Sequence, residues 1–197
     1  MVRAGWGLGK RVISDEQLVE ESLAGSALAF SDLVERYQER LLRYLLTRSG
    51  NRADAEDAVQ DTFISAYRYL HSYNPRWRFS TWIYRIAIRN AARQPQGEIR
   101  DVDVIADENA PDPLEECIVA CERENVWLTA KRLLNQDAYA AMWLRYVEDM
   151  SIKEIARALD KTQSWTKVTL LRGRRSLSAE LTEGASGAAG RQIYGRI

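Results

Sequence analysis

The feature of this 197-residue chain that most constrains its fold is a break in helical periodicity at 94–113. This stretch holds three prolines, a glycine and many acids, a composition typical of a linker. On both sides apolar residues recur at helical spacing, and strand signals are scarce. The sequence therefore predicts an all-α fold with two small helical domains, at about 14–93 and 114–182, joined by a flexible acidic linker at 94–113.

Turn and capping residues divide the two domains into helices. Ser151 and Glu154 fit a capping box, and Asp54 is a suitable N-cap. The ends of the chain, 1–13 and the Gly/Ala-rich 183–197, are expected to be a flexible arm and a flexible tail. The expected helices cover about 15–24, 27–49, 54–72, 79–93, 114–133, 136–147, 151–159 and 163–181.

Composition narrows the class of protein without naming it. Hydrophobic residues make up 46% and charged residues 28%, which is ordinary for a globular protein. No apolar run is long enough to span a bilayer, and the basic first residues lack the apolar core of a signal peptide. We therefore expect a cytoplasmic protein.

Charge is distributed in blocks, although the formal net charge is zero. Residues 62–97 contain six arginines and no acid, and residues 161–179 contain five basic residues and no acid. Between them, residues 98–124 contain ten acids and two arginines. Charge runs are usually solvated faces, but two long acid-free stretches favour contact with nucleic acid.

The first basic block interleaves aromatic and arginine residues in the segment NPRWRFSTWIYRIAIRNAAR, residues 74–93. Aromatic rings stack on unpaired bases and arginines neutralise phosphates, as single-stranded nucleic acid requires. The alternative is that the rings at 79 and 82, with the neighbouring isoleucines, are core residues. We expect some rings to be buried and others exposed.

The second basic block follows two short helical patterns separated by a polar break at 160–163. Two short helices with a tight turn, the second one basic, are the plan of a helix-turn-helix, whose second helix enters the major groove. Bare helix-turn-helix patterns often mislead, so the pattern alone does not decide between DNA binding and a plain helical pair.

Two groups of segments resemble the RNA polymerase sigma-70 superfamily. AFSDLVERYQERLLRYLL, DAEDAVQDTFISAYRYL and FSTWIYRIAIRNAAR resemble its regions two-one to two-four over about 26–93. MWLRYVEDMSIKEIARAL and LLRGRRSL resemble region four-two. The linker leaves no room for the intermediate domain of housekeeping members, so the resemblance is to the extracytoplasmic-function (ECF) group.

The resemblance implies roles for particular residues. On the third expected helix it implies a face that docks on the β′ clamp of core polymerase: Asp57, Gln60, Asp61 and Ile64. In the aromatic and basic segment it implies a set that opens and reads the −10 element: Arg76, Arg78, Phe79, Trp82, Tyr84, Arg85, Arg89 and Asn90. In the helix-turn-helix it implies a set for the −35 element: Thr162, Gln163, Ser164, Lys167 and Leu171 near bases, and Arg172, Arg174 and Arg175 mostly on phosphates.

The chain also departs from its relatives. Asp160 stands where the helix-turn-helix usually has a turn glycine, and Asp tolerates a left-handed backbone better than most residues. Arg89 and Asn90 look transposed, and Trp165 and Thr166 replace smaller or aliphatic residues. Trp165 either completes the core or points towards DNA or a partner.

The linker length agrees with binding two separated promoter elements. Twenty extended residues reach at most about 65–70 Å. Two turns of B-DNA measure about 68–72 Å. The resemblance implies three partners: core RNA polymerase (β′ clamp and β flap), promoter DNA and an anti-sigma factor.

Two alternative functions remain to be considered besides that of a sigma factor. A sigma mimic could titrate an anti-sigma factor without driving transcription, and a helix-turn-helix repressor would leave the first domain unexplained. Cys117 and Cys121, four apart, are commoner as buried residues than as a metal or redox pair, and His71 is expected at a helix end. With one histidine and no phosphate loop, we expect no enzyme activity, no metal and no cofactor.

Overall fold

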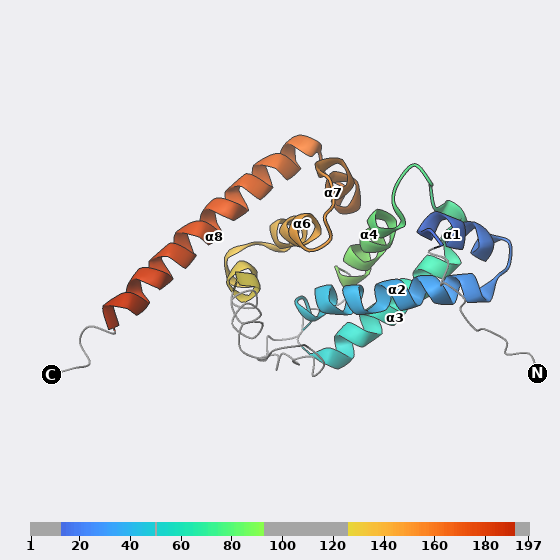
Figure 1. Ribbon diagram of the computed structural model, residues 1–197, viewed down its shortest axis with the longest axis horizontal. Helices are drawn as coiled ribbons and strands as arrows, with labels where there is room; N and C mark the ends of the chain where they lie inside the picture. The colour runs from blue at the N-terminus through green and yellow to red at the C-terminus, as the bar shows by residue number, and fades with distance from the viewer. Residues whose placement is uncertain (1–12, 50, 93–125, 192–197) are drawn as a thin grey trace, which may run out of the picture.

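The computed structural model describes residues 13–49, 51–92 and 126–191, and in these ranges it is all-helical (Figure 1). The predicted all-α class is confirmed. The predicted arm, apart from residue 13, lies outside the described residues. So do the predicted linker and the pair Cys117 and Cys121.

The first domain contains α1 (Asp15–Leu23), α2 (Ala27–Leu46), α3 (Arg52–Arg68), the short 3-10 helix η1 (Leu70–Ser72) and α4 (Phe79–Ala91). The prediction that α3 begins at Asp54 was wrong by a few residues. Its N-cap is Asn51, whose side-chain oxygen accepts a hydrogen bond of 2.8 Å from the Asp54 backbone N–H. Asp54 instead supplies a carboxylate to the first turn, where it suits the helix dipole.

The second domain contains a helix at 126–133, then α6 (Gln136–Tyr146), α7 (Ile152–Leu159) and α8 (Gln163–Arg191). The capping box predicted from Ser151 and Glu154 is present, with both reciprocal hydrogen bonds formed. Helix α8 runs about ten residues past its predicted end, so residues 183–191 of the expected flexible tail are helical. In Figure 1 this helix extends well beyond the rest of the second domain.

The turn between α7 and α8 depends on Asp160, whose φ of 59° and ψ of 41° are left-handed. Its backbone N–H donates to the carbonyls that end α7, and the N–H of Lys161 donates to the Ala156 carbonyl at 2.9 Å. A glycine would adopt this conformation without strain, and Asp is among the few other residues that visit it. The departure noted in the sequence is therefore compatible with the helix-turn-helix fold.

The two domains pack against each other and bury one continuous set of hydrophobic side chains. Helix α4 of the first domain lies against α7 of the second, side by side in Figure 1. The fully buried Tyr44 of α2 contacts Trp143 of α6, with ring centroids 5.9 Å apart. Within the second domain, Gly173 of α8 lets the backbone approach Met142 of α6, because an added Cβ would lie 3.2 Å from the Met142 sulfur.

Candidate nucleic-acid and protein interfaces

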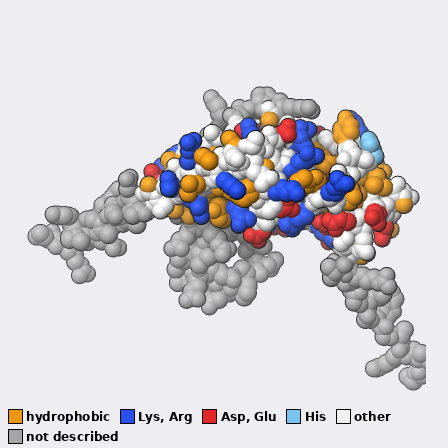
Figure 2. Space-filling view, turned by 90° about the horizontal axis from the view of Figure 1, so that it is seen from above, with side chains coloured by type: hydrophobic (Ala, Val, Ile, Leu, Met, Phe, Trp, Pro, Cys, Tyr) orange, Lys and Arg blue, Asp and Glu red, His pale blue; other side chains and the backbone are white. Residues whose placement is uncertain are grey.

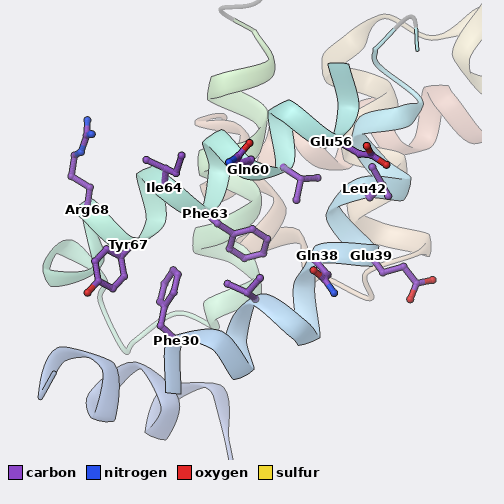
Figure 3. A pocket seen from close by; sticks show the side chains of 12 residues that line it. Phe30, Gln38, Glu39, Leu42, Glu56, Gln60, Phe63, Ile64, Tyr67 and Arg68 are labelled. Carbon is purple, nitrogen blue, oxygen red and sulfur yellow. The ribbon is translucent and has the colours of Figure 1, made fainter. Parts of the chain in front are cut away.

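A groove of about 870 Å³ runs between α2 and α3 (Figure 3). Gln60 and Ile64, two of the predicted docking residues, line it from α3, and Ile64 is 49% exposed. Asp57 and Asp61 are exposed on the same helix but do not line the groove. The rest of the lining is Phe30, Val34, Gln38, Glu39, Leu42, Glu56, Val59, Phe63, Tyr67 and Arg68.

Sequence reasoning missed the α2 wall of this groove. Phe30 packs edge-on against Tyr67 of α3 at 4.9 Å, and Tyr67 is itself 61% exposed. Exposed aromatic and aliphatic side chains surrounded by a polar rim are typical of a surface that binds a helix or strand of another protein. Figure 3 shows Phe30 and Phe63 directed into the space between the two helices.

In the aromatic and basic segment, the predictions for Phe79 and Tyr84 were wrong. Both side chains are fully buried. Phe79 begins α4 and packs between Tyr37 and Tyr73, with centroids 5.3 and 5.9 Å away. Tyr84 packs on Tyr44 at 5.7 Å and donates a hydrogen bond to the Arg40 carbonyl. Burial raises the pKa of Tyr84, so its phenol stays protonated. These two rings support the first domain and are not available to stack on bases.

The remaining predicted −10 residues are accessible. Arg76, Arg78 and Arg89 are exposed, while Trp82, Arg85 and Asn90 are half-buried. Trp82 packs at 5.6 Å from Phe79, which fixes the ring beside α4. The expectation that some rings of the segment are buried holds for Phe79 and Tyr84, whereas Trp77 and Trp82 are half-buried where exposed rings were expected.

A smaller hollow of about 370 Å³ opens beside α4, with four of these residues in its wall. Two buried polar atoms on its lining residues, Thr81 Oγ1 and Arg85 Nε, have no hydrogen-bond partner among the described residues. The lining also includes three arginines, Arg85, Arg89 and Arg157, so the hollow suits a ligand with acceptor atoms. The lining is Ser65, Tyr69, Ser72, Asn74, Trp77, Thr81, Trp82, Arg85, Ile86, Arg89, Asn90 and Arg157.

The charges around Arg85 also favour an anionic ligand in this hollow. Burial lowers the pKa of its guanidinium, and the neighbouring Arg89 and Arg157 lower it further, whereas Asp160 opposes the change. A guanidinium stays charged in proteins despite such shifts. Three crowded arginines at one hollow therefore create a positive electrostatic potential that favours an anionic group such as a phosphate.

In the second domain, α7 and α8 form the predicted helix-turn-helix. Thr162 caps α8, since its hydroxyl accepts a hydrogen bond of 3.1 Å from the Trp165 N–H. The buried side of α8 consists of Thr166, Leu170, Gly173 and Leu177. All the predicted −35 residues lie on its accessible side: Thr162, Gln163, Ser164, Lys167, Leu171, Arg172, Arg174 and Arg175. Figure 2 shows Lys and Arg spread along the face seen from above, with hydrophobic side chains between them.

The unusual residues of this helix are accommodated by packing. Trp165 is half-buried against the core, with the Lys161 Nζ 5.4 Å from its ring centroid. The fully buried Thr166 satisfies its hydroxyl by donating to the Thr162 carbonyl at 3.0 Å. Of the two roles considered for Trp165, the structure thus favours completion of the core.

Two further observations concern the described residues. No helix in the described ranges is long and apolar enough to cross a membrane. The same ranges contain no cluster of three or more His, Cys, Asp or Glu side chains able to hold a metal ion. His71 lies exposed in η1, at the end of α3.

Comparison with known proteins defines the class first. Residues 33–96 match the model of Sigma-70 region 2, and residues 127–177 match that of Sigma-70, region 4. With the α2–α3 groove, the basic α4 and the helix-turn-helix, these matches define a sigma factor of RNA polymerase. The solved structure of CnrH in complex with the cytosolic domain of CnrY has the same fold, with a TM-score of 0.65 and 22% identity over 86% of this chain and 97% of that one.

Curated relatives narrow the group. The ECF RNA polymerase sigma-E factor of Haemophilus influenzae is 31% identical over 86% of this chain and 96% of its own length. The RNA polymerase sigma-H factor of Pseudomonas aeruginosa is 28% identical over 85% and 93%, respectively. The chain belongs to the sigma-70 family and to its ECF group. It is a sigma factor, which binds core RNA polymerase and directs promoter-specific transcription initiation.

Proposed function

We propose that three surfaces of this sigma factor divide the work of initiation. The α2–α3 groove docks on the clamp helices of core polymerase, the accessible side of α4 opens and reads the −10 element, and the N-terminal half of α8 binds the −35 element. The observation that carries this assignment is the hollow beside α4, which combines a half-buried Trp82 with three crowded arginines.

The groove is suited to a helix. Its walls are apolar while its rim carries Gln38, Glu56 and Gln60, so an amphipathic helix could bury one face and keep the other polar. We include Phe30 and Tyr67 in this docking surface together with Ile64. The exposed Asp57 and Asp61 then lie beside the groove, where they would attract basic residues of the polymerase.

For the −10 element we retain Arg76, Arg78, Trp82, Arg85, Arg89 and Asn90 and exclude Phe79 and Tyr84. An aromatic ring next to arginines is the arrangement that binds unpaired bases and their phosphates. We add Trp77, which is half-buried and lines the same hollow. Asn90 is held by a hydrogen bond of 3.3 Å from its side-chain nitrogen to the Ser65 hydroxyl.

For the −35 element, the exposed start of α8 supplies groups that can reach base edges: Gln163, Ser164, Lys167 and Leu171. Arg172, Arg174 and Arg175, further along the helix, would bind phosphates and fix position. The first-turn residues of a recognition helix are those that enter the major groove most deeply.

We further infer that the protein acts in the cytoplasm, has no catalytic activity of its own and is held inactive by an anti-sigma factor. The support is family membership and the CnrH complex, in which a sigma-like chain is bound by the cytosolic domain of another protein. The β flap of polymerase is the proposed partner of the second domain.

Runoff transcription tests these assignments. Purified core polymerase, this protein and a library of genomic promoter fragments should give discrete transcripts. These should disappear when Trp82 and Arg85 are both changed to Ala, while binding to core polymerase persists. Core binding without any transcript would instead favour a chain that only titrates an anti-sigma factor.

A further inference from the structure

Helix α8 has an exposed face directly opposite the side that packs on its own domain. The buried side consists of residues at helical spacing between 166 and 177. Because an α-helix turns by about 100° per residue, the residues furthest from that side can be identified from the sequence numbers. They are all exposed, and they recur at the same helical spacing: Ser164, Val168, Leu171 and Arg175.

Two of these four side chains are aliphatic. Val168 is 46% exposed and Leu171 is 40% exposed. A β-branched residue has a lower helix propensity than leucine, so an exposed valine contributes little to the helix or to the core. Single exposed aliphatic residues are common on protein surfaces. Here, however, two of them lie three positions apart on the face that a helix-turn-helix directs into the major groove.

Basic side chains border this aliphatic pair. Lys167 precedes it on α8, Arg172 and Arg175 follow it, and all three are exposed. Among the ion pairs between side chains that the structure describes, none involves a basic residue of α8. These cations are therefore available to the phosphates and acceptor atoms of DNA. An aliphatic pair inside such a basic surface is placed to contact base edges, since it has no group that binds a phosphate.

The base edge that suits an aliphatic side chain is that of thymine. In the major groove thymine carries its C5-methyl group, whereas guanine presents two acceptors and cytosine an amino donor. An aliphatic side chain packed against guanine or cytosine would displace water from these groups and offer no hydrogen bond in return. Packed against thymine, it buries the methyl group. Val168 and Leu171 therefore favour A·T pairs over G·C pairs.

The spacing of the pair matches that of neighbouring base pairs. Three residues of an α-helix rise by about 4.5 Å. Successive base pairs of B-DNA are separated by about 3.4 Å. A helix lying along the groove therefore brings Val168 and Leu171 to two successive base pairs. Ser164, one turn before Val168 on the same face, is small enough to let the helix approach the bases closely.

Packing fixes the direction of this face. Gly173, on the buried side of α8, lies so close to Met142 of α6 that an added Cβ would be 3.2 Å from its sulfur. Leu170, one turn earlier, is 6% exposed. A rotation of α8 that buried Val168 would expose Leu170 and move Gly173 away from Met142. The aliphatic pair therefore stays directed outwards, where DNA can reach it.

We propose that Val168 and Leu171 read the C5-methyl groups of thymines in two successive base pairs, so that the −35 element of this sigma factor contains two successive A·T pairs. The inference rests on the −35 role proposed above for the start of α8. It adds Val168 to the residues of that surface and names the bases that the surface selects. The specificity is hydrophobic at this step, and the flanking cations supply affinity that does not depend on sequence.

The first measurement is a selection of binding sites. Holoenzyme assembled from core polymerase and the full chain selects from duplexes of about 60 random base pairs, which hold two elements separated by two turns of B-DNA. Two sequence blocks should be enriched, and the upstream block should contain two successive A·T pairs. Val168→Ala should lose the preference at one of these pairs and leave the downstream block unchanged. Val147→Ala, which shortens an exposed valine at the end of α6, is the matched control and should select the wild-type sequence.

The second measurement removes the methyl groups from the DNA. The probe is the selected duplex with deoxyuridine in place of thymine at one of the two pairs, which keeps the base pair and lacks only the methyl group. Affinity of the holoenzyme, measured by competition at fixed salt, should fall about three- to fivefold for each methyl group removed. Val168→Ala should bind the thymine and uracil duplexes equally at one of the two positions. Val147→Ala should discriminate as the wild type does.

The outcomes separate this inference from the proposed function. An upstream block without successive A·T pairs, or equal binding of the wild type to thymine and uracil duplexes, would overturn the reading of methyl groups and leave the −35 role of α8 standing. A uniform loss of affinity in Val168→Ala, with discrimination retained, would also overturn it. A selection that enriched no upstream block would overturn both proposals. Because Val168 is exposed, its substitution should leave the fold intact, which urea unfolding beside Val147→Ala verifies.

Discussion

The carboxylate of Glu148 accepts a hydrogen bond from the guanidinium of Arg40, although the two residues lie 108 positions apart and in different domains. Burial alone would lower the pKa of Arg40, but the charge and hydrogen bond of Glu148 outweigh it, and the pKa is raised. Glu148 is almost fully enclosed. The contact between the two domains therefore contains one ion pair whose environment differs from that of an ordinary surface pair.

A double-mutant cycle should show this difference. Arg40→Ala, Glu148→Ala and the double variant, unfolded in urea, should give a coupling energy of about 1–3 kcal/mol, because each single change leaves a partly desolvated charge unpaired. The control is the pair Arg52 and Glu56, both about half exposed, for which coupling should stay below about 0.5 kcal/mol. Equal couplings would contradict the view that burial strengthens the pair of Arg40 and Glu148.

Phe79 and Trp82 should separate folding from DNA opening. Phe79→Ala should cost about 3–5 kcal/mol of unfolding free energy, because the ring is fully buried among Tyr37 and Tyr73. Trp82→Ala should cost less, since the ring is half-buried, yet abolish runoff transcripts. Urea unfolding and transcription, measured on the same preparations, compare the two.

Phe79→Leu serves as the control for that comparison. It keeps most of the buried volume, so the folded variant should retain transcription. A folded Phe79→Leu protein that bound core polymerase but gave no transcript would restore a DNA role for this ring.

The sequence predicted helix ends best where capping residues are explicit. Ser151 and Glu154 form the expected capping box, and the accessible side of α8 holds every residue predicted there. The sequence did not show that Phe79 and Tyr84 are buried. Helix α4 is contacted by α2, α3 and α7, so it buries a wider part of its surface than the single apolar face of an amphipathic helix.

Long-range pairing was also beyond the sequence. Arg85 and Asp160 are 75 residues apart, and nothing in either local pattern indicates the other. Asp160 could be recognised only as a departure at a glycine position. The α2 wall of the docking groove was missed for a related reason. In the sequence Phe30 looks like an ordinary core residue, and only the fold shows that it packs against Tyr67 of α3.

Ile64 should be a strong contributor to polymerase binding. Ile64→Asp introduces a charge into the apolar groove and should weaken binding to core polymerase about five- to thirtyfold, the range of a central interface residue. Leu28→Asp is the matched control, since Leu28 is 80% exposed on α2 and does not line the groove. Equal effects of the two substitutions, measured by anisotropy of labelled protein, would argue against the groove as the docking site.

Stability at alkaline pH should depend on Tyr73. Burial, then the charges of Glu16 and Asp15, raise its pKa to about 12, against about 10 in an unfolded chain. Between these values the folded state binds more protons than the unfolded state, so stability is fully present below about pH 10 and falls as pH rises towards 12. Tyr73→Phe should flatten this fall, measured as urea midpoints from about pH 9 to 12. An unchanged slope would contradict the assignment.

Gln163 and Arg174 should affect promoter binding in different ways. Arg174→Ala removes a proposed phosphate contact. It should weaken binding of the holoenzyme to all promoters similarly and reduce the dependence of log K on log salt by about one. Gln163→Ala removes a proposed base contact at the start of α8, so it should cost about 1–3 kcal/mol on the preferred −35 sequence and much less on altered sequences. Binding of both variants to a panel of −35 substitutions at two salt concentrations distinguishes the effects. A uniform loss for Gln163→Ala would mean that this side chain only positions the helix.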